Sequence, residues 1–224
     1  MQMSRWMARL CAAGVLGVVA LGAGAGAAEP PSNKQVSSFF RAVQMDDAST
    51  VRKMVGTVVN ANELNPLGGE PALVLAIREG SSAVVQDLLA HPGTDLERKA
   101  VNGNTALMMA AFKRDGDTVR ALLAKGAKVN QPGWTALHYA AASGDAAIAQ
   151  LLIEHGAQVS ALSPRTSGAV TPLMMAAREG QDAIVRLLLA KGANPALKNT
   201  EGFTAAQLAK QGGHDKLAAL LSGR

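Results

Sequence analysis

The feature that most constrains the fold of this chain is a helical pattern that recurs along most of its length. One copy spans residues 171–192, TPLMMAAREGQDAIVRLLLAKG. Thr171 followed by Pro172 is typical of a helix start, because the hydroxyl caps free amides and the proline already has helical φ. Apolar residues then recur at helical spacing, Gly180 interrupts them, and a second helix is predicted up to Gly192. Helices this short are marginal alone, so each pair requires a similar neighbour to cover its apolar face.

The chain contains several such neighbours. Further copies start at Pro71, Thr105 and Thr135, and a shortened copy starts at Thr204. Successive starts are separated by 34, 30, 36 and 33 residues. A period near ~33 residues with a T-P-L-H-x-A opening is characteristic of ankyrin repeats. From about Phe39 onward the chain therefore resembles the ankyrin-repeat family.

The resemblance implies an all-α ankyrin-repeat solenoid of stacked helix-turn-helix units with hairpin-like finger loops. Residues 36–70 are interpreted as a degenerate N-terminal cap repeat and its loop, because the helical spacing is present without the usual opening. The repeats that follow are expected at 71–104, 105–134, 135–170 and 171–203, with a C-terminal capping repeat at 204–224.

The first 28 residues have the organisation of a secretory signal peptide. Two arginines precede an apolar run, Leu10–Leu21, and small residues lead to a cleavage site near Ala27 or Ala28. The alternative is an uncleaved anchor, although a membrane span requires about 20 apolar residues. A polar linker is predicted at 29–35. We therefore expect a periplasmic protein, with secretion from the cell as the alternative.

Charge and cysteine content narrow the function further. Without residues 1–28, which hold two of the 22 basic residues, the chain has 20 Lys+Arg against 17 Asp+Glu. An excess this small and dispersed argues against a nucleic-acid partner. The removed segment also contains Cys11, the only cysteine, so the exported chain has no disulfide. No membrane association is expected after signal cleavage.

The resemblance also implies that another protein binds across the finger loops and the first helix of each unit. Carried over by position, the partner-binding residues expected in this chain are Arg78, Glu79, Asn102, Asn104, Phe112, Lys113, Gln131, Trp134, Arg178, Glu179, Glu201 and Phe203. The same positions include Ala142, Ser143, Ser167 and Val170.

Trp134 and Phe112 are the strongest candidates in this set. Aromatic residues make up 3% of the chain, and large aromatics are frequent energetic anchors at interfaces. The alternative for Trp134 is that it packs back on its own loop, which the 30-residue spacing shortens.

Two departures from the repeat pattern are noted. The finger at 160–170 is longer than the others, and we interpret it as a tolerated insertion rather than as a specific contact. Arg114 stands where other copies have a glycine after the first helix, which predicts a local distortion.

No catalytic or phosphate-binding motif is present, so an enzyme is not expected and no cofactor is predicted. His138 occupies the histidine of the repeat opening, where the resemblance implies a structural role. The alternative function is soft-metal or small-ligand binding by Met108, His138 and Met174, which stacking would align. We expect instead a protein-binding scaffold, which protects or stabilises an enzyme of the cell envelope.

Overall fold

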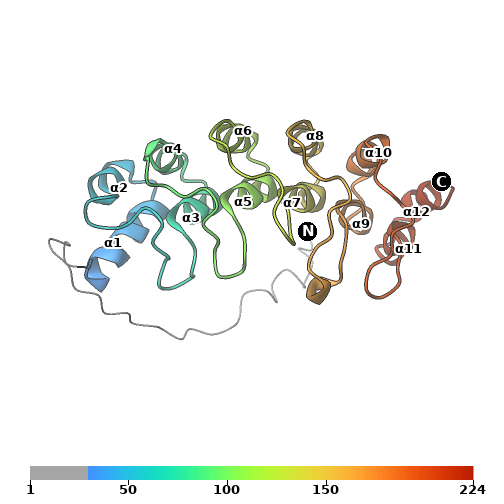
Figure 1. Ribbon diagram of the computed structural model, residues 1–224, viewed down its shortest axis with the longest axis horizontal. Coiled ribbons are helices and arrows are strands. Elements are labelled where there is room, and N and C mark those ends of the chain that lie inside the picture. Colours follow the sequence, from blue (N-terminus) through green and yellow to red (C-terminus); the bar gives the residue numbers. More distant parts are fainter. Residues whose placement is uncertain (1–29, 224) are drawn as a thin grey trace.

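The computed structural model describes residues 30–223 of this protein, and they form an all-α solenoid. The predicted signal peptide lies outside the described residues. The helices form two rows, and hairpin loops project from one edge of the stack (Figure 1). The inner row, next to the hairpins, consists of α1 (Asn33–Gln44), α3 (Ala72–Glu79), α5 (Ala106–Lys113), α7 (Ala136–Ser143), α9 (Pro172–Arg178) and α11 (Ala205–Gln211). The outer row consists of α2 (Ala48–Met54), α4 (Ser82–Ala90), α6 (Gly116–Ala124), α8 (Ala146–Glu154) and α10 (Asp182–Ala190), and α12 (Asp215–Ser222) pairs with α11.

Each helix contacts its own partner and the corresponding helix of the next repeat. The inner helices touch in the order α1, α3, α5, α7, α9 and α11, and the outer helices in the order α2, α4, α6, α8 and α10. Contacts between neighbours alone are the defining property of a solenoid. The predicted ankyrin-type stack is therefore confirmed.

The threonines that open the repeats cap the inner helices. The Thr171 hydroxyl accepts a hydrogen bond from Met174 N at 3.2 Å, and Thr105 and Thr204 do the same three residues on. Pro71 begins α3 without any side-chain cap. The shared opening therefore has a local cause, since the side-chain oxygen satisfies an amide that the helix leaves free.

The core runs continuously along the stack. Leu88, Leu122, Leu152 and Leu188, one from each successive outer helix between α4 and α10, have no exposed surface. Equivalent leucines thus pack repeat against repeat. This arrangement is what short helical pairs require, because each of them buries its apolar face against the next.

One sequence prediction is wrong at the N-terminal end. The expected linker, 29–35, is helical from Asn33, because Ser32 and Gln35 form a capping box. The Ser32 hydroxyl accepts from Gln35 N, and the Gln35 side chain accepts from Ser32 N at 2.9 Å. The S-x-x-Q spacing is a recognised helix start, so the cap repeat begins earlier than its apolar pattern indicates.

Side chains also tie neighbouring repeats together at the bases of the loops. Asn62 donates to Gly93 O and accepts from Asp95 N, at 2.8 and 2.7 Å. Asn130 makes the equivalent pair of bonds to Gly156 O and Gln158 N. Each asparagine therefore holds its loop to the next one and orders the edge from which the hairpins project.

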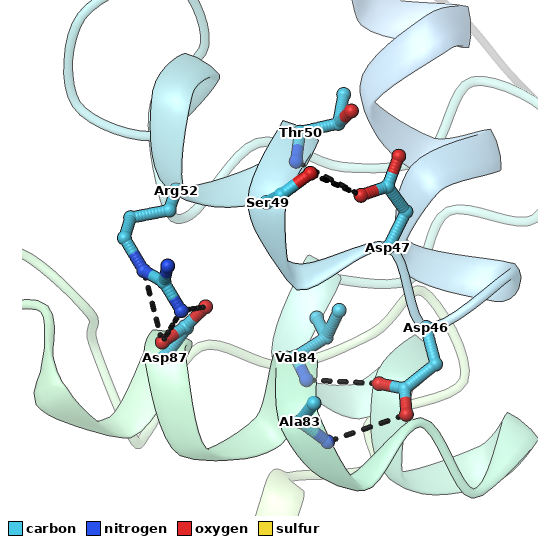
Figure 2. A network of polar contacts seen from close by, with 8 residues as sticks. All are labelled: Asp46, Asp47, Ser49, Thr50, Arg52, Ala83, Val84 and Asp87. Atoms are coloured by element: carbon cyan, nitrogen blue, oxygen red, sulfur yellow. Dashed lines mark hydrogen bonds and ion pairs between the residues drawn. The ribbon is translucent and has the colours of Figure 1, made fainter.

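The cap repeat is joined to the next repeat by a polar network (Figure 2). Asp46, in the turn between α1 and α2, accepts hydrogen bonds from Val84 N at 2.9 Å and Ala83 N at 3.4 Å. Those amides belong to the first turn of α4, whose own N-cap residue Ser81 makes no side-chain cap bond. Arg52 forms a two-nitrogen ion pair with Asp87, with a closest distance of 2.7 Å. Asp46 thus caps a helix of the neighbouring repeat.

Replacing Asp46 with alanine is expected to lower the free energy of unfolding by about 1 kcal/mol, the usual contribution of a helix N-cap. Alanine keeps the Cβ at the positive φ of 54°, so the backbone strain remains and the loss comes mainly from the carboxylate. Asp46→Asn keeps an acceptor and serves as the control. Urea denaturation measures both variants, and equal losses in the two would contradict the trans-capping role.

The distortion predicted at Arg114 is absent, so that prediction is wrong. Arg114 has φ 60° and ψ 31°, close to Gly80 and Gly144, which end the corresponding helices α3 and α7. Arg114 thus adopts the same left-handed conformation that glycine has in the other two repeats. Left-handed conformation costs a residue with a Cβ roughly 1–2 kcal/mol, so the strain falls on Arg114 instead of being relieved by a changed path.

Arg114→Gly is therefore expected to raise the free energy of unfolding by about 1 kcal/mol, because glycine adopts this conformation without the Cβ clash. Its ion pair with Asp145 is long, at 3.6 Å, and exposed, so its loss matters little. Arg114→Ala removes the same guanidinium but keeps the strain. Chemical denaturation that ranks alanine equal to glycine would rule out backbone strain as the cause.

Candidate protein-binding surface

The inner helices and the hairpins present a continuous face, and its centre holds an aromatic cluster of Phe112, Trp134 and Tyr139. The Phe112 and Tyr139 rings meet edge to face, with centroids 6.1 Å apart and planes at 87°. Trp134 contacts Tyr139 at 6.4 Å. All three side chains are only partly buried against the core. The aromatic cluster therefore offers apolar surface to a partner.

Tyr139 is the residue that joins the cluster together. It lies in α7, between Phe112 at the end of α5 and Trp134 at the base of the hairpin before α7. Its hydroxyl donates to Asn104 Oδ1 at 2.5 Å, which links α7 to the preceding hairpin. Burial raises the pKa of Tyr139 to about 12, so it remains a neutral donor. The cluster is held in place before any partner arrives.

The hairpin that carries Trp134 is the short one. Figure 1 shows that the loop between α6 and α7 projects less far than the loops on either side. Gln131 bonds to Glu97 of the preceding loop, and Gly133 lies so close to Pro164 that a Cβ there would be 3.1 Å from Pro164 Cγ. The short hairpin is thus held by both neighbours, and the aromatic cluster lies at its base.

His138 lies directly beneath Trp134 and is completely buried. The ring centroids are 5.2 Å apart at 79°. Thr135 N donates to His138 Nδ1 at 3.2 Å, so that nitrogen is an acceptor, and Nε2 lies 3.1 Å from Val170 O, to which it donates. Burial lowers the pKa of His138 to about 4, which agrees with a neutral ring.

These contacts overturn the soft-metal alternative. Both imidazole nitrogens of His138 are used within the protein, and Met108 and Met174 are 3% and 1% exposed. No lone pair of the ring is left for a metal ion, and the thioethers lie in the core. Among residues 30–223, no three His, Cys, Asp or Glu side chains are placed to hold a metal ion. This geometry agrees with the structural role that the resemblance to ankyrin repeats implies for His138.

The charged candidates of the flanking repeats are engaged with each other. Arg78 forms ion pairs with Glu79 at 3.0 Å and with the buried carboxylate of Glu70 at 2.9 Å. Burial raises the pKa of Glu70, and Arg78 opposes that rise. Arg178 lies 3.4 Å from Glu179, and burial lowers its pKa while Glu179 raises it. These pairs present little net charge to a partner.

The remaining sequence candidates divide by repeat. Asn104, Phe112 and Trp134 are brought together around Tyr139, whereas Glu201 and Phe203 belong to the hairpin before α11. Asn102 and Lys113 are exposed, Asn102 in the hairpin before α5 and Lys113 beside Phe112. Val170 is buried and its carbonyl accepts from His138, so its inclusion among surface positions is wrong. Ala142, Ser143 and Ser167 are partly exposed.

Sequence reasoning missed Tyr139. The available signal was its uniqueness, since it is the only tyrosine of the chain and follows His138 directly. Its role depends on Asn104 and Phe112 of the preceding repeat, which no local pattern connects to it. The Trp134 ring contacts His138 and Tyr139 of α7 and retains exposed surface.

None of the helices between residues 30 and 223 combines the length and the apolar character that crossing a bilayer requires. The longest, α1, has 12 residues.

Comparison with known proteins agrees with the geometry. The family model "Ankyrin repeats (3 copies)" matches overlapping segments at 39–132, 73–163, 129–199 and 162–224. A probable E3 ubiquitin-protein ligase, XBOS34, of Oryza sativa subsp. japonica is 39% identical over 49% of this chain and 22% of its own length. The human transient receptor potential cation channel subfamily A member 1 is 28% identical over 68% of this chain and 14% of its own.

A bacterial relative is also found. A putative ankyrin repeat-containing protein of Treponema pallidum is 29% identical over 63% of this chain and 47% of its own length. The chain thus spans less than half the length of these three relatives. What they share with it is the repeat region, which does not carry over the activity of a whole ligase or channel.

Proposed function

Because the chain belongs to the ankyrin-repeat family, whose repeats are protein-protein interaction modules, we propose that it is an exported scaffold that binds a protein partner across its inner helices and hairpins. The observation that carries this proposal is the aromatic cluster, partly exposed at the base of the shortened hairpin. Large aromatic residues near the centre of an interface are frequent among the few side chains that dominate its binding energy.

The stack supports the proposal because it is ordered before binding. The inter-repeat bonds of Asn62, Asn130 and Tyr139 hold hairpins and helices in one arrangement. Little conformational entropy is then lost on docking, which raises affinity for a given contact area. Binding without catalysis is proposed, since the face lacks the paired acid, base or nucleophile that a reaction requires.

Export to the periplasm is part of the proposal. It rests on the N-terminal pattern of two arginines, an apolar run and small residues before position 28. A scaffold in that compartment meets envelope enzymes, and the partner we propose is one that it protects or stabilises. Mass spectrometry of the protein recovered from the envelope fraction tests the processing, and an intact Met1 would contradict cleavage.

The experiment for partner binding is affinity capture from envelope extracts with the purified protein and with a Phe112→Ala/Trp134→Ala variant. One stoichiometric protein should be recovered by the natural chain and lost with the variant. Arg120→Ala, on the outer helix α6, is the matched control and should capture as the natural chain does. A partner retained equally by the double variant would place binding elsewhere.

A further inference from the structure

Charge is distributed unevenly along the stack. Residues 30–97 contain 5 Lys+Arg and 8 Asp+Glu, whereas residues 98–223 contain 14 and 8. Because the repeats stack in sequence order, this asymmetry is also a spatial one (Figure 1). The cap end is acidic, and the stack from the hairpin before α5 onward is basic. A field of this kind attracts and orients a partner of opposite charge.

Within the basic part, some of the charge without an acidic partner lies next to the aromatic cluster. Arg78 and Arg178 each have the adjacent glutamate within ion-pair distance. The corresponding helix end of α5 carries Lys113 and Arg114 instead. Lys113 is exposed and forms no ion pair with the described residues, and Arg114 has only Asp145 at 3.6 Å. Lys113 therefore stands where the repeats of α3 and α9 have Glu79 and Glu179, and Arg114 stands where they have a glycine.

The loops on both sides of the short hairpin add cations. Arg98 and Lys99 precede the turn before α5, and Arg165 lies in η2 (Arg165–Ser167), the short helix of the long loop before α9. All three are exposed, and none is ion-paired within the part of the chain that the structure describes. Two acids lie in the loop before Arg98: Glu97 accepts from Lys128 N and bonds to Gln131, which joins the loops, and Asp95 accepts from Glu97 N.

We propose that the partner segment docking on the aromatic cluster is acidic: it places an apolar or aromatic anchor residue on Phe112, Trp134 and Tyr139 and neighbouring carboxylates near Lys113 and Arg114. This inference rests on the proposed function and adds the chemistry of the partner.

A protein segment fits this surface better than a nucleic acid does. The five cations named above come from three separate segments of the chain, and they alternate with the carboxylates of Glu97 and Asp145. A phosphate backbone instead requires a continuous basic track. The aromatic rings also pack edge to face on one another, so they form a wall for an apolar side chain.

The test is selection from a random peptide display library with the purified protein as bait, which presupposes nothing about the natural partner. Enriched peptides should have a net negative charge and a large apolar or aromatic residue. Synthetic copies should bind at least about tenfold more weakly when their acidic residues are replaced by lysine, or when salt is raised to several times the physiological level.

Matched variants locate the effect. The variant Lys113→Glu/Arg114→Glu should bind these peptides at least about tenfold more weakly than the natural chain does. Arg120→Glu, on the outer helix α6, should have little effect on their affinity. Thermal melting verifies that both variants are folded. Enriched peptides that are neutral or basic, or tighter binding of a single-stranded oligonucleotide than of the acidic peptides, would overturn the inference.

The two proposals fail in different ways. Neutral or basic peptides could instead bind the aromatic cluster and lose that binding in the Phe112→Ala/Trp134→Ala variant. This result would agree with the scaffold function and refute the acidic partner. A library from which no peptide is enriched counts against the acidic segment, whereas capture of a protein partner in the envelope experiment would still support the scaffold.

Discussion

Lowering the pH from about 7 to about 5 is expected to reduce the free energy of unfolding by about 2 kcal/mol through His138 alone. Burial lowers the pKa of this imidazole to about 4 in the folded protein, against 6.5 for an exposed histidine. Between these values the unfolded chain binds a proton that the folded chain does not. Stability therefore falls as the pH decreases through 6.5, and the loss is complete below about 4.

The main cause is burial of the ring, which disfavours its charged form, while the hydrogen bond to Val170 O opposes the shift. His138 Nδ1 must accept from Thr135 N, and only Nε2 carries a proton for Val170 O. Protonation would set an N–H at Nδ1 against the amide of Thr135 and would leave a charge in the core. The repeat opening would lose its attachment to the ring, whereas Nε2 would still donate to Val170 O.

Urea denaturation across this pH range measures the effect, with His138→Gln as the informative variant. Glutamine is already used at the same position of the last repeat, where Gln207 Oε1 accepts from Thr204 N at 2.8 Å. His138→Gln should flatten the pH dependence. His155→Gln, which removes an exposed histidine, should leave it unchanged. An equal slope in the natural chain and in His138→Gln would refute the assignment.

The second large effect concerns binding. Trp134→Ala is expected to weaken the complex with the captured partner by about 2–4 kcal/mol, or roughly 30- to 1,000-fold, as truncation of a central aromatic anchor does. Its ring covers His138 and contacts Tyr139, so a modest drop in melting temperature is expected as well. Isothermal titration calorimetry and thermal melting separate the two effects.

Tyr139→Phe is the matched comparison for this prediction. It keeps the ring that contacts Phe112 and Trp134 but removes the hydroxyl that bonds to Asn104. We expect affinity to fall by less than about tenfold, because a single hydrogen bond contributes about 1 kcal/mol. A Trp134→Ala protein that melts several degrees lower but binds its partner as before would show that the tryptophan is only structural.

Features that depend on a few consecutive residues were predictable. The threonine caps, the two short helices of each repeat and the apolar core positions all follow from local spacing, and the structure agrees. Phe112 and Trp134 could be selected as candidate contacts from their positions within the repeat. Where a local rule was overlooked, as with the capping box of Ser32 and Gln35, the expected boundary was displaced.

Features that join two repeats were not predictable. The cap that Asp46 provides to α4 involves residues 37 and 38 positions away, and the bond between Tyr139 and Asn104 spans 35 positions. Such pairs depend on how far each repeat is rotated and shifted against the last. A sequence pattern does not encode that geometry, because many side-chain pairs are compatible with the same repeat period.

The amino-acid sequence by itself determined that this protein is a stack of short helical pairs, since helices of this length and spacing bury their apolar faces only against copies of themselves. Only the tertiary structure decided which side chains meet across the repeats. It placed Tyr139 between Phe112 and Trp134, used both nitrogens of His138 within the core, and left Lys113 without an acidic partner among the described residues. Those outcomes depend on the distances between repeats, which arise only when the stack has formed.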